Sequence, residues 1–351
     1  MTTLVTGSAG FIGANLVRHL RITRPEMNIV SLDVLGYAGH EANLRDLDGD
    51  DGHVLVRGDI ADAELVGEVF AVHDISGVIH LAAESHVDRS IDSPLGFVHS
   101  NVHGTAVLLE AARTHWGDRR DVRFHHVSTD EVFGSAKPGG LFSETTPYDP
   151  RNPYAATKAA GDHLVRAWHE TFGLPTVITN CTNNYGPFQF PEKLIPVTIM
   201  NTIERRPIPL YGDGRNIRDW LFVEDHCEAI RRVFEDGADG ETYCIGGNSP
   251  MSNVELIPKI IDRVDEHLGR APNTSRGLIE HVDDRPGHDR RYAMDTSKIT
   301  GDLDWSPQTP LEVGLDATVE WYLSHQAWVA EVGSAEHDDF QRRWYAQREK
   351  A

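Results

Sequence analysis

The sequence contains little cysteine and lacks a long apolar run. Its cysteines, Cys181, Cys227 and Cys244, are too few and too scattered for a disulfide framework or a zinc site, so small buried thiols in a reducing compartment are expected. No run approaches the roughly 20 apolar residues that cross a bilayer, and no charged-then-apolar leader precedes the first strand-like segment. These features predict a cytoplasmic protein with no membrane partner.

Basic residues are scarce as well. The 33 lysines and arginines are outnumbered by 54 aspartates and glutamates, which gives a formal net charge of −21. No basic tract offsets this excess, so nucleic acid and membrane surfaces are disfavoured as partners. The 19 histidines show no HExxH or similar paired spacing, and no metal site is expected.

A glycine motif follows the first short apolar strand. Gly7, Gly10 and Gly13 have the spacing GxxGxxG, and Phe11 and Ile12 begin the amphipathic helix that comes next. The first two glycines permit a tight turn and close approach of the backbone to a pyrophosphate, and the third lets the helix pack on its strand. A plain glycine-rich turn is the alternative, but the residues that follow favour dinucleotide binding.

Those residues are small or acidic side chains at the ends of the next predicted strands. The strand at 28–35 carries Asp33, about 20 positions beyond the glycines, where the adenosine ribose hydroxyls would be held; this favours NAD over NADP. Asp59, with Ile60 beside it, is expected near the adenine amino group. Ala82 is small enough to let the cofactor lie across the strand ends.

The alternation of strands and helices predicts an α/β fold with a doubly wound parallel sheet of the Rossmann type. Further strands are expected at 53–60, 77–85 and 121–131, and a helix at 103–115. Ligands of such sheets bind at the carboxyl ends of the strands. The stretch Thr129-Asp130-Glu131 stands at such an end, which makes its two carboxylates functional candidates rather than a solvated turn.

Tyr154 and Lys158 are four residues apart and share one face of a predicted helix. A nearby ammonium favours the phenolate, so Lys158 is expected to lower the pKa of Tyr154 toward neutrality. An amphipathic helix rim would be the commoner explanation of such a pair on its own. Together with the glycine motif, the pair becomes strong evidence for a functional site.

With these motifs the chain resembles the short-chain dehydrogenase/reductase superfamily, in its extended branch that acts on nucleotide sugars. The Thr-Asp-Glu triplet is similar to that of the dTDP-glucose 4,6-dehydratases, whereas the 4-epimerases lack the carboxylate pair. Four further stretches resemble the same family: 81–90, 183–196, 211–226 and 284–292.

The resemblance implies an NAD-dependent dehydration of dTDP-glucose to a 4-keto-6-deoxy sugar nucleotide. Tyr154, supported by Lys158, would take the C4 hydroxyl proton while NAD accepts the C4 hydride, and Thr129 would bond near the C4 oxygen. Glu131 would then remove the C5 proton as Asp130 protonates the departing C6 hydroxyl. Such a pair must begin with one neutral and one ionised carboxyl group, and burial would raise the pKa of at least one.

The resemblance also assigns substrate contacts to the second half of the chain, together with Ser85 at a strand end, and it implies a homodimer built on the helix of Tyr154. Surface ion pairing is the alternative for the arginines, and helix capping for Asn253. The expected contacts are Ser85, Asn183, Glu192, Lys193, Arg218, Asn253, Arg285 and His288.

Two parts of the chain are expected, an NAD-binding domain and a smaller, discontinuous α/β substrate lobe. The domain would comprise 1–182, 223–247 and part of 299–330, and the lobe 183–222 plus 248–298; the tail, 331–351, has no assignment. Three other functions stay open at this point. They are dehydration of another nucleotide sugar such as a UDP-linked hexose, 4-epimerisation, and cofactor sensing without catalysis.

Overall fold

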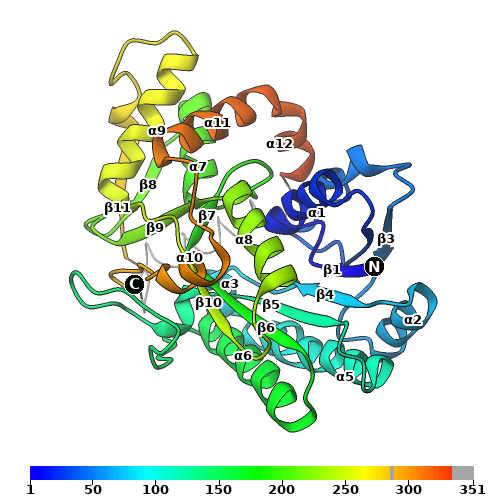
Figure 1. The fold of residues 1–351 in the computed structure, drawn as a ribbon. Coiled ribbons are helices and arrows are strands. Elements are labelled where there is room, and N and C mark those ends of the chain that lie inside the picture. The colour runs from blue at the N-terminus through cyan, green and yellow to red at the C-terminus, as the bar shows by residue number, and fades with distance from the viewer. Residues whose placement is uncertain (285–287, 334–351) are drawn as a thin grey trace.

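The computed structural model describes residues 1–284 and 288–333, and its largest feature is a sheet with helices on both faces (Figure 1). The elements of this sheet and its helices are β1 (Thr2–Thr6), α1 (Phe11–Thr23), β2 (Asn28–Asp33), β3 (His53–Arg57), α2 (Ala63–His73), β4 (Gly77–His80), α3 (Val87–Asp92), α4 (Pro94–Val98), η3 (His99–Gly104), α5 (Thr105–Trp116), β5 (Arg123–Thr129), η4 (Asp130–Phe133), α6 (Pro153–Phe172), β6 (Thr176–Cys181), α8 (Val223–Asp236), β10 (Thr242–Ile245) and α10 (Ser297–Leu303).

The sheet has seven strands in the order β10-β6-β5-β4-β1-β2-β3, and every pair in it is parallel. The chain winds outward from β1 through β2 and β3, then returns to the other side of β1 for β4. The strand order therefore reverses between β1 and β4, where ligands of such sheets bind. The predicted doubly wound parallel sheet is confirmed.

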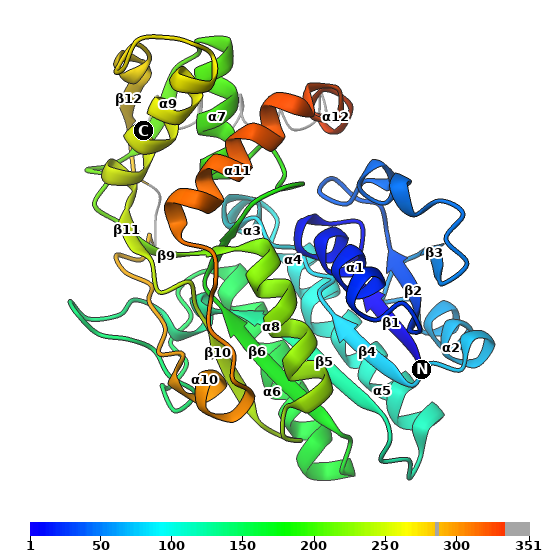
Figure 2. The same cartoon turned by 45° about the horizontal axis from the view of Figure 1, so that its top comes forward.

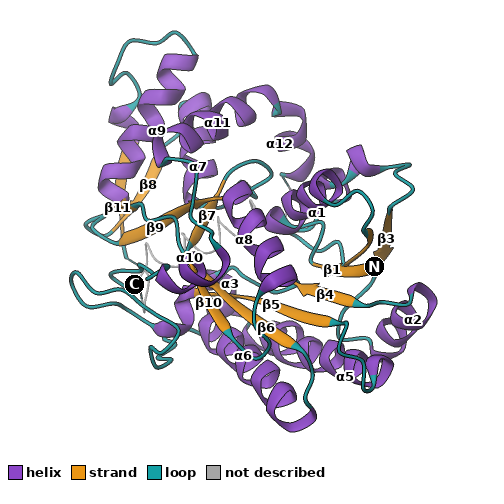
Figure 3. Ribbon diagram, viewed as in Figure 1, coloured by secondary structure: helices purple, strands orange, loops and turns teal. Residues whose placement is uncertain are grey.

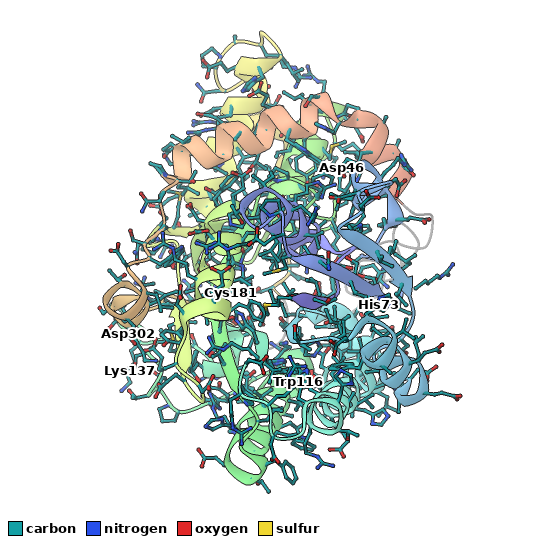
Figure 4. The ribbon with its side chains drawn as sticks, turned by 45° about the vertical axis from the view of Figure 1, so that its right-hand side comes forward. Asp46, His73, Trp116, Lys137, Cys181 and Asp302 are labelled. Atoms are coloured by element: carbon teal, nitrogen blue, oxygen red, sulfur yellow. The ribbon has the colours of Figure 1, made fainter. Side chains whose placement is uncertain are left out.

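Helices cover both faces of the sheet, which explains why its central strands are buried along almost their whole length. Helices α1 and α8 pack together on one face, and α2, α5 and α6 lie side by side on the other (Figure 2). The side chains between these layers form two cores, one beneath each set of helices. Figure 4 shows Cys181 in this interior, while Lys137 and Asp302 lie at the periphery.

A smaller lobe stands over the carboxyl ends of the strands (Figure 3). It contains a three-stranded sheet, β11-β9-β7, and a two-stranded one, β12-β8, packed with helices. Its elements are β7 (Asn183–Tyr185), α7 (Leu194–Glu204), β8 (Ile208–Tyr211), β9 (Ile217–Phe222), β11 (Pro250–Ser252), α9 (Asn253–His267), β12 (Ile279–Val282), α11 (Leu311–Ser324) and α12 (Gln326–Val332).

After the first strands of the lobe, the chain returns to the large sheet. Helix α8 and strand β10 return to the large sheet, and α10 packs on β10. Helix α11 instead packs on α7 and α9, because its buried Leu315, Val319 and Tyr322 belong to the core of the lobe. The residue limits of the two parts stay a prediction, and the tail from residue 334 onward lies outside the described residues.

Several predicted strands are shorter in the structure. The segment at 77–85 is a strand only over Gly77–His80, and Asp59 follows the end of β3 by two residues. Asn183, one of the expected substrate contacts, begins the short strand β7. Within residues 1–284 and 288–333, no helix combines the length and apolar character that a bilayer span requires.

Candidate active site

Strand β5 ends at Thr129, and the side chains of the next two residues lie in different surroundings. Asp130 and Glu131 open the short 3₁₀ helix η4, and the Thr129 hydroxyl caps that helix by accepting the amide N–H of Glu131 at 3.3 Å. Asp130 is 2% exposed, whereas Glu131 reaches the wall of a cavity. Two adjacent carboxyl groups therefore occupy different environments.

The surroundings of Asp130 favour its neutral form. Burial raises its pKa well above the ordinary value, and the charge of Glu131 raises it further, outweighing the opposite effect of Arg218. Its Oδ2 atom is buried and has no hydrogen-bond partner among the described residues, while Oδ1 accepts the Thr129 hydroxyl at 3.3 Å. The prediction that burial would raise the pKa of one carboxyl group is confirmed for Asp130.

Tyr154 and Lys158 lie one turn apart on α6, both buried. The expected depression of the Tyr154 pKa is wrong for this structure: burial, and then the charge of Glu131, raise that pKa well above its ordinary value. The physical reason is the burial of the phenol, which the spacing to Lys158 does not reveal. Lys158 Nζ itself donates to the backbone carbonyl of Val127 at 2.9 Å. A hydrogen bond from Thr129 acts in the opposite sense and favours the phenolate.

A second buried carboxylate, Asp162, lies one turn beyond Lys158. It accepts hydrogen bonds from Ser128 Oγ at 3.0 Å and Tyr148 OH at 2.7 Å, and His126 Nε2 lies 3.3 Å away. Burial alone would raise the pKa of Asp162, but the hydrogen bond and charge of His126 bring it below the ordinary value. An ionised Asp162 also raises the pKa of Lys158 against the larger lowering by burial.

The glycine loop is shaped for close packing. Gly7 has a φ of +69°, and a side chain there would lie 2.6 Å from the amide nitrogen of Ala82. A side chain at Gly13 would lie 2.1 Å from the Gly7 carbonyl oxygen. The loop, the end of β4 and the start of α1 therefore meet at backbone distance. A pyrophosphate would meet backbone amides here with no side chain in the way.

Asp33 stands at the end of β2, beside this loop. Its oxygens accept the amide N–H groups of Ala9, at 2.9 Å, and Leu35, at 2.8 Å. The carboxylate therefore orders the loop, and the remaining lone pairs can accept ribose hydroxyls. Asp59 accepts the Ala61 amide N–H and contacts His99 at 3.2 Å; its expected bond to adenine stays a prediction.

A cavity of about 830 Å³ separates the large sheet from the lobe. It has the size of a pocket for a ligand as large as a nucleotide sugar. Residues predicted to bind substrate lie on its wall from both parts of the chain, together with the predicted catalytic residue Glu131. They are Ser85, Glu131, Asn183, Glu192, Lys193, Arg218, Asn253 and His288; the wall does not include Thr129, Asp130, Tyr154 or Lys158, and Arg285 lies outside the described residues.

The Glu192 side chain is buried and lies close to three other side chains. Its carboxylate accepts the Tyr37 hydroxyl at 3.0 Å and lies 3.4 Å from His86 Nε2 and 3.8 Å from Lys193 Nζ. Tyr37 belongs to the loop after β2, so this contact ties the cofactor side to the lobe. Burial raises the pKa of Tyr37 well above its ordinary value, and Glu192 raises it further.

Arg218 is held by the protein on two sides. It donates to the carbonyl oxygens of Ile217, at 2.9 Å, and Asp289, at 3.0 Å, and its guanidinium lies 4.2 Å from the centre of the Tyr292 ring. The alternative of surface ion pairing does not fit Arg218, because its side chain is buried and lies on the cavity wall. Its contact with a diphosphate stays a prediction.

Asn253 does not cap α9, because Ser252 forms the capping box with Glu255. Asn253 Oδ1 is instead buried without a hydrogen-bond partner among the described residues, on the cavity wall. The capping alternative is therefore wrong. His288 also lines the cavity, and its Nδ1 lies 2.5 Å from Asp284.

Reasoning from the sequence missed other wall residues. Asn152, Tyr292, Gln189 and Trp220 line the cavity from segments that are distant along the chain. Asn152 could have been identified as a helix cap, since it precedes Pro153 at the start of α6. Within residues 1–284 and 288–333, no three histidine, cysteine or acidic side chains are grouped in a way that could hold a metal ion.

Comparison with known proteins gives matches along almost the whole chain. The family described as GDP-mannose 4,6 dehydratase matches residues 4–318. A dTDP-glucose 4,6-dehydratase of Xanthomonas campestris pv. campestris (strain B100) is 52% identical over 337 residues, 94% of this chain and 95% of that protein. The dTDP-glucose 4,6-dehydratase 1 of Escherichia coli (strain K12) is 47% identical over 363 residues, 99% of this chain and 100% of that protein.

A solved structure is similar as well. DesIV from Streptomyces venezuelae, a dTDP-glucose 4,6-dehydratase with NAD and TYD bound, superposes with a TM-score of 0.87. The two chains are 42% identical, and the match covers 95% of this chain and 100% of that one.

Proposed function

Because the chain belongs to the dTDP-glucose 4,6-dehydratases, within the family of GDP-mannose 4,6 dehydratase, we propose that it converts dTDP-glucose into dTDP-4-keto-6-deoxyglucose. The observation that carries the proposal is the pair at the end of β5. One carboxyl group, Asp130, is buried, and its burial raises its pKa and favours the protonated form; its neighbour Glu131 lines a cavity of the size that a nucleotide sugar needs.

NAD, when bound, accepts the hydride from C4 of the hexose and later returns it to C6. The residues that would hold the cofactor are Gly7, Gly10 and Gly13 at the pyrophosphate, with Asp33 at the ribose. The rest of the proposed set is Phe11, Ile12, Asp59, Ile60, Ala82, Tyr154 and Lys158. The fit is supported by backbone packing at Gly7 and Gly13 that a single methyl group would disturb.

Oxidation at C4 requires removal of the hydroxyl proton, and Tyr154 is the proposed base. Its pKa lies above the ordinary value in this structure, so the phenol must be helped to ionise. Thr129 supplies a hydrogen bond that favours the phenolate, and Lys158 supplies the positive charge on the same helix. The C4 ketone then makes the C5 hydrogen acidic.

Elimination uses the two carboxyl groups in opposite roles. Glu131, on the cavity wall, takes the C5 proton, and the C5–H electrons form the C5–C6 double bond as the C6–O bond breaks. Asp130 gives its proton to the departing hydroxyl, which leaves as water. Glu131 afterwards returns a proton to C5. A neutral Asp130 beside Glu131 is the protonation pattern that this step needs.

The remaining cavity residues are proposed to hold the nucleotide sugar. Arg218 and His288, with Arg285, would bind the diphosphate, because guanidinium groups suit phosphate oxygens. Ser85 and Asn183 would contact the sugar, and the other contacts proposed are Glu192, Lys193 and Asn253. Preference for dTDP over UDP rests on the relatives, which are dTDP-glucose 4,6-dehydratases.

One assay separates this activity from its alternatives. Purified protein given dTDP-glucose, with no added reductant, should form a product with the alkaline ultraviolet absorbance of a 4-keto sugar. A 4-epimerase would form dTDP-galactose without that signal, and a cofactor sensor would form neither. A panel of dTDP-, UDP-, GDP- and CDP-glucose then identifies the preferred nucleotide; equal turnover of UDP-glucose would contradict the dTDP assignment.

We also propose that the protein is a cytoplasmic homodimer that pairs through α6. Residues Ala156 and Ala167 are exposed on that helix, which would let a second copy approach closely. The unpaired Cys181, Cys227 and Cys244 suit a reducing compartment. Sedimentation equilibrium tests the dimer: an Ala156→Arg variant should become monomeric, and a monomeric wild type would contradict the proposal.

A further inference from the structure

Asn152 connects two parts of the proposed site through one side chain. Its Oδ1 accepts the amide N–H of Ala155 at 2.8 Å, which caps α6, the helix of Tyr154 and Lys158. Its Nδ2 lies 3.3 Å from Oε2 of Glu131. The cap settles the orientation of the amide, because the partner of a backbone N–H must be an oxygen, so the NH₂ group faces the carboxylate.

The loop between Glu131 and Asn152 is closed tightly at its base, which brings these residues together. The Asp149 amide N–H donates to the Val132 carbonyl at 2.9 Å, and Gly134 has a φ of +72°. A side chain at Gly134 would lie 2.4 Å from the Asp149 carbonyl oxygen. The backbone contacts at the two ends of this loop therefore hold Asn152 and Glu131 close to each other.

We propose that Asn152 is a positioning residue for elimination: its amide aims the carboxylate of Glu131 into the cavity and keeps it ionised while holding it in register with the helix of Tyr154. Asn152 and Glu131 both line the cavity. A residue that only capped the helix could neither orient the Glu131 carboxylate nor favour its ionised form. The inference rests on the proposed function, since it concerns the base of that reaction.

Several acidic groups lie close to Glu131. Asp130 beside it, Tyr154 on α6 and Tyr292 from the lobe side all interact with its charge. Arg218 interacts in turn with Asp130 and Tyr292. An N–H group donated to a carboxylate favours its ionised form, so the Asn152 amide helps to keep Glu131 a base among acidic neighbours.

Two substitutions separate aiming from capping. Asn152→Ser keeps a good cap but loses the amide donor, and Asn152→Asp keeps the cap and puts a second negative charge beside Glu131. Loss of a hydrogen bond to a charged group should slow elimination about 10- to 100-fold in Asn152→Ser, and more in Asn152→Asp. Oxidation at C4 should stay within about twofold of wild type.

The measurements are the exchange of the C5 proton with solvent deuterium, the pre-steady-state rate of C4 oxidation, and the pH dependence of turnover. The acidic limb of the pH profile should move to higher pH in Asn152→Ser and further in Asn152→Asp, because both changes raise the pKa of Glu131. A cap with no role at the site would leave both the profile and the exchange unchanged.

Asp62→Ala is the matched control, because Asp62 caps α2 by accepting the N–H groups of Glu64 and Leu65 and does not line the cavity. It should lower the melting temperature without altering C5 exchange. If Asn152→Ser exchanges the C5 proton at the wild-type rate with an unshifted pH profile, the positioning role is refuted while the proposed function stands. If wild-type protein forms no 4-keto sugar from dTDP-glucose, the proposed function fails and the role of Asn152 fails with it.

Discussion

Replacing Asp130 by asparagine should abolish turnover and yet stabilise the protein at neutral pH. The two effects have one cause, which is that the buried carboxyl group keeps its proton. Burial, and then the charge of Glu131, raise the pKa of Asp130 well above its ordinary value of 3.8. Asparagine has nearly the same shape and can still accept the Thr129 hydroxyl, but it cannot release a proton to the leaving group.

The sign of the stability change follows from proton linkage. Above pH 3.8 the unfolded chain releases the Asp130 proton, while the folded protein still holds it. In that window the folded state binds one proton more, so the free energy of unfolding falls by up to about 1.4 kcal/mol for each pH unit. The variant has no such term. Its advantage over wild type should be absent below pH 3.8 and grow as pH rises toward the folded-state pKa of Asp130.

Urea unfolding of both proteins from about pH 4 to about pH 8 measures this difference directly. Asp50→Asn is the control of opposite sign. The hydrogen bonds of Arg21, at 2.8 and 2.9 Å, lower the pKa of Asp50, so its stabilisation is present above pH 3.8 and is lost on acidification. A difference between wild type and Asp130→Asn that does not depend on pH, or a loss of stability at pH 7, would refute the assignment of Asp130 as a neutral acid.

Three further changes test other parts of the site. Glu131→Gln should permit C4 oxidation but stop elimination, so reduced cofactor accumulates with substrate; full turnover by this variant would show that another group removes the C5 proton. Tyr154→Phe should slow C4 oxidation by about 10²-fold or more in single-turnover kinetics, and an unchanged rate would exclude the phenol as the base. Gly13→Ala places a methyl group 2.1 Å from the Gly7 carbonyl oxygen and should destabilise the protein by about 1–3 kcal/mol while weakening NAD binding in calorimetry. Wild-type affinity in that variant would contradict the packing role of Gly13.

Features that depend on neighbouring residues could be predicted from the sequence. The spacing of Gly7, Gly10 and Gly13 is typical of a turn whose geometry depends only on neighbouring residues. The acidic pair, Asp130 and Glu131, directly follows a strand that the sequence pattern predicts. The doubly wound order also follows, because alternating strands and helices leave few other parallel arrangements.

Features that depend on distant segments could not be predicted. Glu192 looks like a ligand contact in the sequence, but its partner Tyr37 is 155 residues away and meets it only because the lobe stands over the sheet. The pKa of Tyr154 was predicted in the wrong direction, because the four-residue spacing to Lys158 does not reveal how deeply the phenol is buried. Electrostatic predictions from spacing alone omit burial, which is the larger effect here.

The adjacency of Asp130 and Glu131 has a structural consequence for catalysis. A strand that runs into a 3₁₀ turn sends successive side chains to different sides, so neighbours in sequence need not share an environment. Asp130 is directed into the interior, where burial holds its proton, and Glu131 into the cavity, where the Asn152 amide meets it. Each group also favours the protonation state of the other. The charge of Glu131 raises the pKa of Asp130, and a neutral Asp130 places no second negative charge beside Glu131. An acid and a base placed on separate elements would lack this mutual effect, so the pair is best understood as one unit created by the end of β5.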